Sequence, residues 1–286
     1  MSTTTSTSKS SFRDLNDKTA GSERSELTTE CTSCHVSVDS RKFANTERHP
    51  LEDHDYIHAN WVDGYREPKK FILTQAPLPQ SVDQFWNMIW QEKCCIVVSM
   101  IQTVDVPGAE ASSEGSERRL LHLCYFAWGH RATPKKPSDI LCFISDLNFN
   151  RELLIKEAIA AQWLKQNENS PITIHCLAGT TRSATIIALD ISLKKLDDTA
   201  ARSCGPMVDV DDVVLRLRNQ RAMAIQKPEL YLFLHLAVFE YAVRQRCISE
   251  TTYNEIDLEN YFYNPQRPGS GSKDQEESGR KSPSSS

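Results

Sequence analysis

The residues most capable of chemistry are a cysteine and an arginine six positions apart, in the run His175-Cys176-Leu177-Ala178-Gly179-Thr180-Thr181-Arg182-Ser183. A cysteine thiolate is a strong nucleophile, and the planar guanidinium of arginine can bind two phosphate oxygens at once. A hydroxyl at Ser183 could donate a hydrogen bond to the sulfur and ease its later departure. The pattern predicts attack on a phosphate monoester, with Cys176 as nucleophile and Arg182 as phosphate clamp.

Two elements must position this run. Ile172-Thr173-Ile174 predicts a short strand before it, and apolar residues at helical spacing from Ile186 to Leu196 predict a helix after it. A loop between strand and helix points its backbone N–H groups at one spot, with the positive end of the helix dipole behind them. Such a site stabilises a phosphate, and it stabilises a thiolate for the same reason. A bare Cys-x5-Arg also occurs by chance, as a buried structural cysteine with an unrelated surface arginine, so the flanking elements strengthen the prediction.

The rest of the chain alternates between helices and strands. An amphipathic helix is predicted from Ser81, as its N-cap, to Trp90, and a buried strand over Cys95–Val98. Residues 104–119 indicate a loop, residues 151–166 a helix, and Phe233 to Tyr241 a last helix. This alternation predicts an α/β (or α+β) fold in which ligands bind at the carboxyl end of a strand.

Composition and charge limit the other possibilities. The chain has 286 residues with a net charge of −5, which gives no sign of nucleic-acid binding. It has no run of about 18 apolar residues, so no membrane span is expected. The Ser/Thr-rich residues 1–40 and the Pro/Gly/Ser-rich residues 265–286 are predicted to be disordered. One folded domain is expected over residues 41–264.

Nine cysteines do not form a dense disulfide framework in a chain of this length. The absence of an apolar signal-peptide core predicts an intracellular, cytoplasmic location with free thiols. Cys31 and Cys34, with His35 beside them, have a metal-like spacing, but no second Cys/His pair lies nearby. We therefore expect a loop there and no metal, and we expect no cofactor elsewhere.

Three sequence blocks, in this order, resemble the motifs of tyrosine-specific protein phosphatases. They are Tyr56-Ile57-His58-Ala59-Asn60 continuing through Thr74-Gln75-Ala76-Pro77-Leu78 to Trp90, the run around Cys176 and Arg182, and Gln220-Arg221 through Gln226 to Tyr231. The resemblance extends over roughly residues 41–245. It implies a phosphatase fold with a central twisted mixed sheet flanked by helices, here shortened. It also implies a phosphoric monoester hydrolase acting on phosphotyrosine proteins.

The resemblance also assigns residues to roles. Cys176 becomes the nucleophile, Arg182 the phosphate clamp, and Ser183 the group that assists release. Gln226 matches the glutamine that positions the hydrolytic water, and Phe43 stands where the family has the tyrosine that lines a phosphotyrosine slot. The loop residues 177–182 would bind the substrate phosphate.

The block around His58 and the compact length look most like phosphatase-like proteins of polydnaviruses (bracoviruses) carried by parasitoid wasps. This resemblance implies action on phosphotyrosine signalling in host insect cells.

One departure from the family affects the general acid. The family's mobile acid loop reads Trp-Pro-Asp, whereas this chain has Trp128-Gly129-His130. A positioned general acid typically contributes about 10²–10⁴-fold in rate. His130 is either a substitute proton donor or a solvated loop histidine, and the neighbouring Arg131 disfavours its protonated form.

Other departures concern the loop itself. Thr181 replaces a glycine, and a β-branched side chain there would be strained if its φ were positive. Leu230 replaces the family's second glutamine. The segment between Met100 and Tyr125 is much shorter than in the family, which predicts a loosened Arg182.

Three hypotheses remain open from the sequence. The first is a pseudophosphatase, which binds phosphotyrosine proteins with impaired catalysis and so interferes with host signalling. The second is a slow but active tyrosine phosphatase that forms a phosphocysteine at Cys176. The third, supported by Cys176 alone, is a redox-responsive thiol protein.

Overall fold

The computed structural model describes residues 57–101, 118–129, 132–134, 136–203 and 205–248, together with the backbone of residues 34–37. Two residues of the predicted site, Phe43 and His130, lie outside this part of the chain, and so do most of the two predicted tails. Within the described ranges, no helix combines the length and the apolar character needed to cross a bilayer.

A six-stranded mixed sheet forms the centre of the molecule, in the order β1-β5-β4-β6-β3-β2. Its four inner strands, β5, β4, β6 and β3, run parallel, and each edge strand pairs antiparallel with its neighbour. The strands are β1 Cys34–Ser37, β2 Ala59–Gly64, β3 Glu67–Gln75, β4 Ile96–Ser99, β5 Leu121–Tyr125 and β6 Ile172–Cys176. β1 thus lies within residues 1–40.

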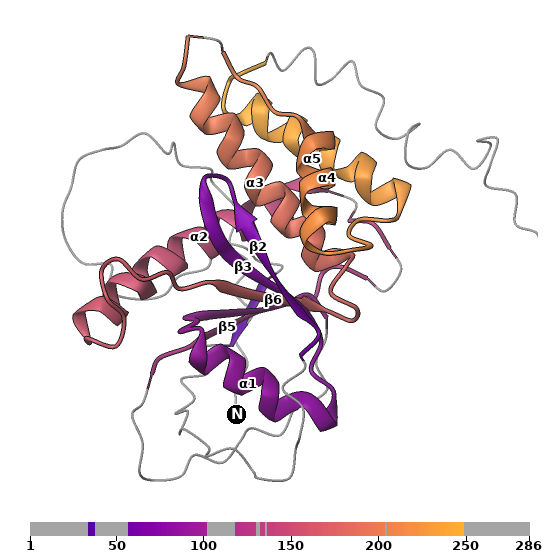
Figure 1. Cartoon of the computed structure of the whole chain (residues 1–286). Coiled ribbons are helices and arrows are strands. Elements are labelled where there is room, and N and C mark those ends of the chain that lie inside the picture. The colour runs from indigo at the N-terminus through magenta and orange to yellow at the C-terminus, as the bar shows by residue number, and fades with distance from the viewer. Residues whose placement is uncertain are drawn as a thin grey trace, which may run out of the picture.

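Helices cover both faces of the sheet, with α1 on one face and α3, α4 and α5 on the other (Figure 1). Their bounds are α1 Val82–Gln91, α2 Pro137–Ala160, α3 Arg182–Ala200, α4 Val210–Gln220 and α5 Pro228–Arg244, and a short 3-10 turn, Pro79–Ser81, precedes α1. α3 packs against α2, α4 and α5.

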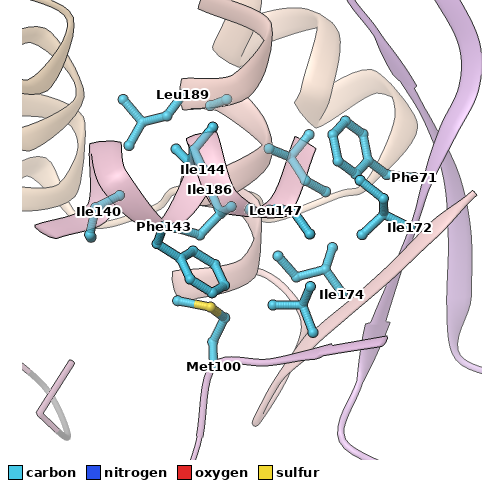
Figure 2. Close-up of a cluster of buried hydrophobic side chains, with 14 of the residues drawn as sticks. Phe71, Met100, Ile140, Phe143, Ile144, Leu147, Ile172, Ile174, Ile186 and Leu189 are labelled. Carbon is cyan, nitrogen blue, oxygen red and sulfur yellow. The ribbon is translucent and has the colours of Figure 1, made fainter. Parts of the chain in front are cut away.

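The two-residue period of the strands divides their side chains between two cores. In β3, Phe71 and Leu73 join the larger core, whereas Ile72 between them joins the smaller one with α1. The larger core also receives Ile174 of β6 and Ile186 of α3, and Figure 2 shows these side chains meeting those of α2. Because β6 and α3 are both buried in this core, the loop between them is anchored at each end.

The predicted α/β class is confirmed, with a mixed sheet flanked by helices and the Cys-x5-Arg loop between a strand and a helix. The strand predicted at Cys95–Val98 and the last helix are also present. The helix predicted over 151–166 has wrong bounds, since α2 begins at Pro137 and ends at Ala160. Proline is favoured in the first turn of a helix, where its missing N–H is not needed, and Pro137 occupies that position.

Ser81 precedes the first residue of α1, as predicted, but its side chain does not cap the helix. Its hydroxyl oxygen instead accepts a hydrogen bond from the backbone N–H of Leu78 at 3.0 Å. The Ser81 hydroxyl thus stabilises the preceding 3-10 turn, whereas the sequence predicted that it would cap α1.

Candidate active site

The predicted nucleophile, Cys176, is the last residue of β6 and is buried, with 1% of its surface exposed. The Ser183 hydroxyl donates a hydrogen bond to Cys176 Sγ at 3.2 Å, and the Thr181 hydroxyl lies 3.8 Å from the same sulfur. The sequence predicted the Ser183 contact, and the structure brings the two side chains together.

The environment of Cys176 favours its thiolate. Burial by itself raises the pKa of the thiol, but hydrogen bonds from the Ser183 hydroxyl and from the N–H groups of Ser183 and Thr181 outweigh it and lower the pKa to about 7. Two other buried thiols, Cys94 and Cys95, have a raised pKa, chiefly because of burial. Cys176 therefore differs from these two thiols in its hydrogen-bond donors, which come from the end of the loop and from the start of α3.

The loop after Cys176 is held from outside by donors that bind its backbone carbonyls. Ala76 N–H, just beyond β3, donates to Cys176 O at 2.8 Å and to Leu177 O at 3.4 Å. At the other end, Thr185 N–H donates to Thr181 O at 2.9 Å within the first turn of α3.

The middle of the loop is held by residues that precede α5. Arg221 donates to Ala178 O at 3.1 Å and to Gly179 O at 3.2 Å. Ile225 N–H donates to Thr180 O at 2.8 Å. Every carbonyl from residue 176 to residue 181 thus has a donor outside the cradle.

These contacts decide where the N–H groups point. In a trans peptide the N–H lies opposite the preceding C=O, so carbonyls held outward turn the following N–H groups inward. The N–H groups of residues 177–182 therefore converge on one side of the loop, at the N-terminus of α3. This arrangement can bind a tetrahedral anion through backbone donors and the helix dipole.

Gly179 is the residue of the loop that no other amino acid could replace without movement. Its φ is +67°, and a Cβ there would lie 2.3 Å from Thr74 O. Thr181, by contrast, has φ −108° and ψ −90°, so the positive φ that would strain a β-branched residue does not occur. The substitution at Thr181 leaves the carbonyl pattern of the loop intact.

Arg182, the predicted clamp, begins α3, and two backbone carbonyls hold its guanidinium. It donates to Met100 O, just after β4, at 3.0 Å and to Gly129 O at 3.2 Å. Gly129 precedes position 130, so this contact joins the segment of the predicted acid to the phosphate loop. The loosened Arg182 that we expected from the shortened sequence is not observed, because these carbonyls support it.

Trp128 fixes the start of that segment. Its side chain is 3% exposed, and its indole N–H donates to Ala132 O at 2.8 Å. Its ring packs against the ring of Phe233 in α5, with 6.1 Å between the ring centroids.

Gln226 lies at the surface in the turn before α5, next to Ile225. Its side-chain amide donates to Met223 Sδ at 3.1 Å. Arg218 stabilises the turn by donating to Ala224 O at 2.9 Å and to Ile225 O at 2.8 Å. The bond from Ile225 to the phosphate loop places this turn beside the cradle.

Sequence reasoning missed Arg221 and Asn60 as parts of the site, although both stand in the blocks that carried the resemblance. Arg221 is 4% exposed and donates to Asn60 Oδ1 at 2.5 Å as well as to the loop. The polar run Arg218-Asn219-Gln220 before Arg221 gave no sequence signal that this arginine is buried, although arginine is almost never fully buried unless it is paired. Among the described residues, no group of three or more His, Cys, Asp or Glu side chains could hold a metal ion.

The chain is similar in sequence to proteins of a known family. A family model described as protein-tyrosine phosphatase matches residues 32–111 and 101–240. The chain belongs to the protein-tyrosine phosphatase family. It is 26% identical over 251 residues to human tyrosine-protein phosphatase non-receptor type 9, covering 74% of this chain and 41% of that protein. The chain thus spans about two fifths of the length of that phosphatase.

Two further comparisons concern a viral protein and a solved phosphatase structure. Probable tyrosine phosphatase protein N1 of Microplitis demolitor bracovirus is 27% identical over 220 residues, covering 63% of this chain and 65% of that protein. A solved structure of the phosphatase PTPN18 superposes with a TM-score of 0.50 at 20% identity, covering 65% of this chain and 72% of that one. The likeness to PTPN18 supports the phosphatase fold.

Proposed function

We propose that this chain is a tyrosine phosphatase-like protein that binds phosphotyrosine proteins and hydrolyses them poorly. The observation that carries the proposal is the phosphate loop, in which six successive carbonyls are held outward and a low-pKa thiol lies at the base. A phosphate monoester bound there would meet the inward N–H groups and the Arg182 guanidinium. Both would neutralise charge on the transferring phosphoryl group.

The first chemical step follows from these groups. Cys176 Sγ attacks phosphorus, an S–P bond forms, and the bond from phosphorus to the tyrosine oxygen breaks. That oxygen leaves as a phenolate unless a general acid gives it a proton. Ser183 would later stabilise the thiolate as it departs, when water positioned by Gln226 attacks the phosphocysteine.

The supply of that proton is the weak point. The sequence has Gly129-His130 where the family has Pro-Asp, so no carboxyl stands at the acid position. An imidazole differs from a carboxyl group in shape and reach. Nucleophile, clamp and cradle are retained while the acid is replaced, and this combination favours binding over turnover.

The relatives give the proposal a substrate class and a setting. Solved PTPN18 structures hold HER2 phospho-peptides, which supports phosphotyrosine proteins as partners of the same fold here. One relative is a probable tyrosine phosphatase of a bracovirus, and we infer from the viral source that this chain interferes with phosphotyrosine signalling of a host cell. A cytoplasmic location belongs to the same proposal, because Cys176 must stay reduced to react.

A second candidate function is a slow but active tyrosine phosphatase. The lowered pKa of Cys176 and the position of the Gln226 turn beside the loop favour it, since both serve turnover and not binding. The two candidates differ in the rate at which the aryl oxygen leaves.

The test compares an activated aryl phosphate, whose leaving group needs little protonation, with a phosphotyrosine peptide. Our proposal predicts turnover of the activated ester that disappears in Cys176→Ser, with far slower turnover of the peptide. His130→Asp should speed peptide hydrolysis by about 10²-fold or more, the contribution of a general acid. His130→Asn is the matched control, because it has the shape of Asp but no acidic proton to transfer to the leaving oxygen.

The outcomes separate the candidates. If His130→Asp and His130→Asn both leave the peptide rate unchanged and the parent hydrolyses the peptide nearly as fast as the activated ester, the second candidate, an active phosphatase, replaces our proposal. If neither ester is hydrolysed by any variant, the assigned roles of Cys176 and Arg182 are wrong.

A further inference from the structure

Arg221 joins the phosphate loop to the start of β2. Its Nε donates to Gly179 O at 3.2 Å, and its Nη2 donates to Ala178 O at 3.1 Å. Its Nη1 donates to Asn60 Oδ1 at 2.5 Å, and Nη2 also contacts His58 Nδ1 at 3.2 Å. Because the side chain is 4% exposed, these four contacts fix where the guanidinium lies.

The direction of the His58 bond follows from chemistry. Arginine has five N–H donors, no acceptor, and no neutral form in proteins. His58 Nδ1 must therefore be the acceptor, and it must carry no proton. A protonated imidazole has two donors and no acceptor, so it would lose this bond and place a second positive charge beside the guanidinium.

We propose that His58 is a positioning residue that makes the phosphate loop sensitive to pH through Arg221. When His58 is neutral, it holds Arg221 against Ala178 O and Gly179 O, and the N–H groups that follow these carbonyls point into the cradle. When His58 is protonated, Arg221 is pushed from this position and the two amides lose their fixed direction. The inference rests on the proposed use of the loop as a phosphate cradle.

The contact between His58 Nδ1 and Arg221 is the one that protonation of the ring would change. Its backbone carbonyl accepts bonds from the Thr74 hydroxyl and from Gln75 N–H of β3, both neutral groups that keep the main chain in place. The acidic residue of β2, Asp63, has its carboxylate engaged by the Gln220 amide at 2.7 Å and by a backbone N–H. Among the residues that the structure describes, the charged group in contact with the His58 ring is Arg221.

Holding Arg221 against the phosphate loop does not require a residue that can become charged. Asparagine at position 58, as in the family's Tyr-Ile-Asn-Ala-Asn motif, could accept the same bond without titrating. Histidine differs from asparagine because it can take up a proton on the nitrogen that accepts this bond.

The experiment measures sulfate binding by the full chain between pH 8 and pH 5, with NMR following the amide of Gly179. Sulfate remains a dianion over this range, so its own charge does not change. Every protein carries Cys176→Ser, which removes the titration of the thiol from the cradle. The comparison is between His58, His58→Asn, which accepts the bond at every pH, and His58→Leu, which never accepts it.

With His58, sulfate affinity should fall about five- to tenfold as the pH is lowered, which is the upper part of the range for one ordinary protein hydrogen bond. His58→Asn should bind sulfate equally at both ends of the range. His58→Leu should bind weakly at both ends, which shows that the lost acceptor matters apart from any effect on folding.

Three results would overturn the inference. An equal fall in His58→Asn would place the titrating group elsewhere, and a gain in affinity at low pH would show that the added charge attracts sulfate more than it disturbs the loop. Failure of all variants to bind sulfate at any pH would overturn the proposed cradle as well, so the two failures are distinguishable.

Discussion

Removal of the Ser183 hydroxyl tests whether that group sets the reactivity of Cys176. The Ser183 hydroxyl donates to Cys176 Sγ at 3.2 Å, and both residues are buried. A hydrogen bond to a charged group contributes about 1.5–3 kcal/mol, which corresponds to a pKa change of about one to two units. In Ser183→Ala the pKa of Cys176 should therefore rise from about 7 to 8 or above.

The assay is the rate of alkylation of Cys176 by iodoacetamide as a function of pH, with mass spectrometry identifying the labelled cysteine. The midpoint of the curve should move upward with the pKa. A more basic thiolate is also more nucleophilic, with a Brønsted coefficient of about 0.4–0.5. A one-unit shift should therefore make the variant about threefold slower at pH 6 and about threefold faster at pH 9.5, so that the two curves cross.

Ser192→Ala is the matched control. Ser192 is buried in the same helix, α3, but its hydroxyl donates to Ala188 O at 2.7 Å and does not contact the thiol. Its alkylation curve should coincide with that of the parent. If Ser183→Ala gives the parent's midpoint, the hydroxyl does not stabilise the thiolate and the explanation of the lowered pKa is wrong.

Two further predictions concern the framework of the site. Gly179→Ala should abolish sulfate binding and lower the melting temperature, because its Cβ would meet Thr74 O at 2.3 Å and its φ is +67°; unchanged binding in an NMR titration would contradict the close approach. Lys70→Met should lower the free energy of unfolding by about 3–5 kcal/mol in urea titrations, because it leaves the Asp190 carboxylate buried without its cation. Lys70 and Asp190 are 0% and 1% exposed and 2.6 Å apart, so replacing both with apolar residues should cost much less than replacing one.

The elements around the candidate site were predictable because the sequence information there is local. Cys176, Gly179 and Ser183 lie within eight consecutive residues, and the strand before the loop and the helix after it have clear periodicity. The contact between the Ser183 hydroxyl and the thiol could be stated from spacing alone. The sequence could not show whether the loop keeps its shape around Thr181, because the φ of this residue depends on contacts between distant parts of the chain. The structure shows that the loop keeps its shape.

The supports of the loop were not predictable in the same way. Arg221 and His58 are far from Cys176 in sequence, and they reach the loop only because β2, β3 and the turn before α5 converge there. The sequence also suggested a loosened Arg182, since the segment that supports it in the family is shortened. Backbone carbonyls at Met100 and Gly129 hold it instead, and any residue type could have supplied them.

The bounds of α2 show a different limit. Its apolar stripe was predicted from the sequence over the second half of the helix, where Leu154 and other apolar residues recur at helical spacing. The first half begins at Pro137 and buries most of its apolar residues, and α2 packs against α5 and α3, so the apolar pattern of this half is less periodic. No helix start was predicted at Pro137, although the first turn of a helix accepts proline.

The central claim is that the cradle and nucleophile are competent while leaving-group protonation is not. Its most direct test is the dependence of kcat/KM on leaving-group pKa, measured over a series of aryl phosphates from activated to tyrosine-like. The account predicts a steep fall in rate as the leaving group becomes more basic, and a flatter dependence in His130→Asp. A flat dependence in the parent would contradict the account, because it would mean that an effective general acid is already present.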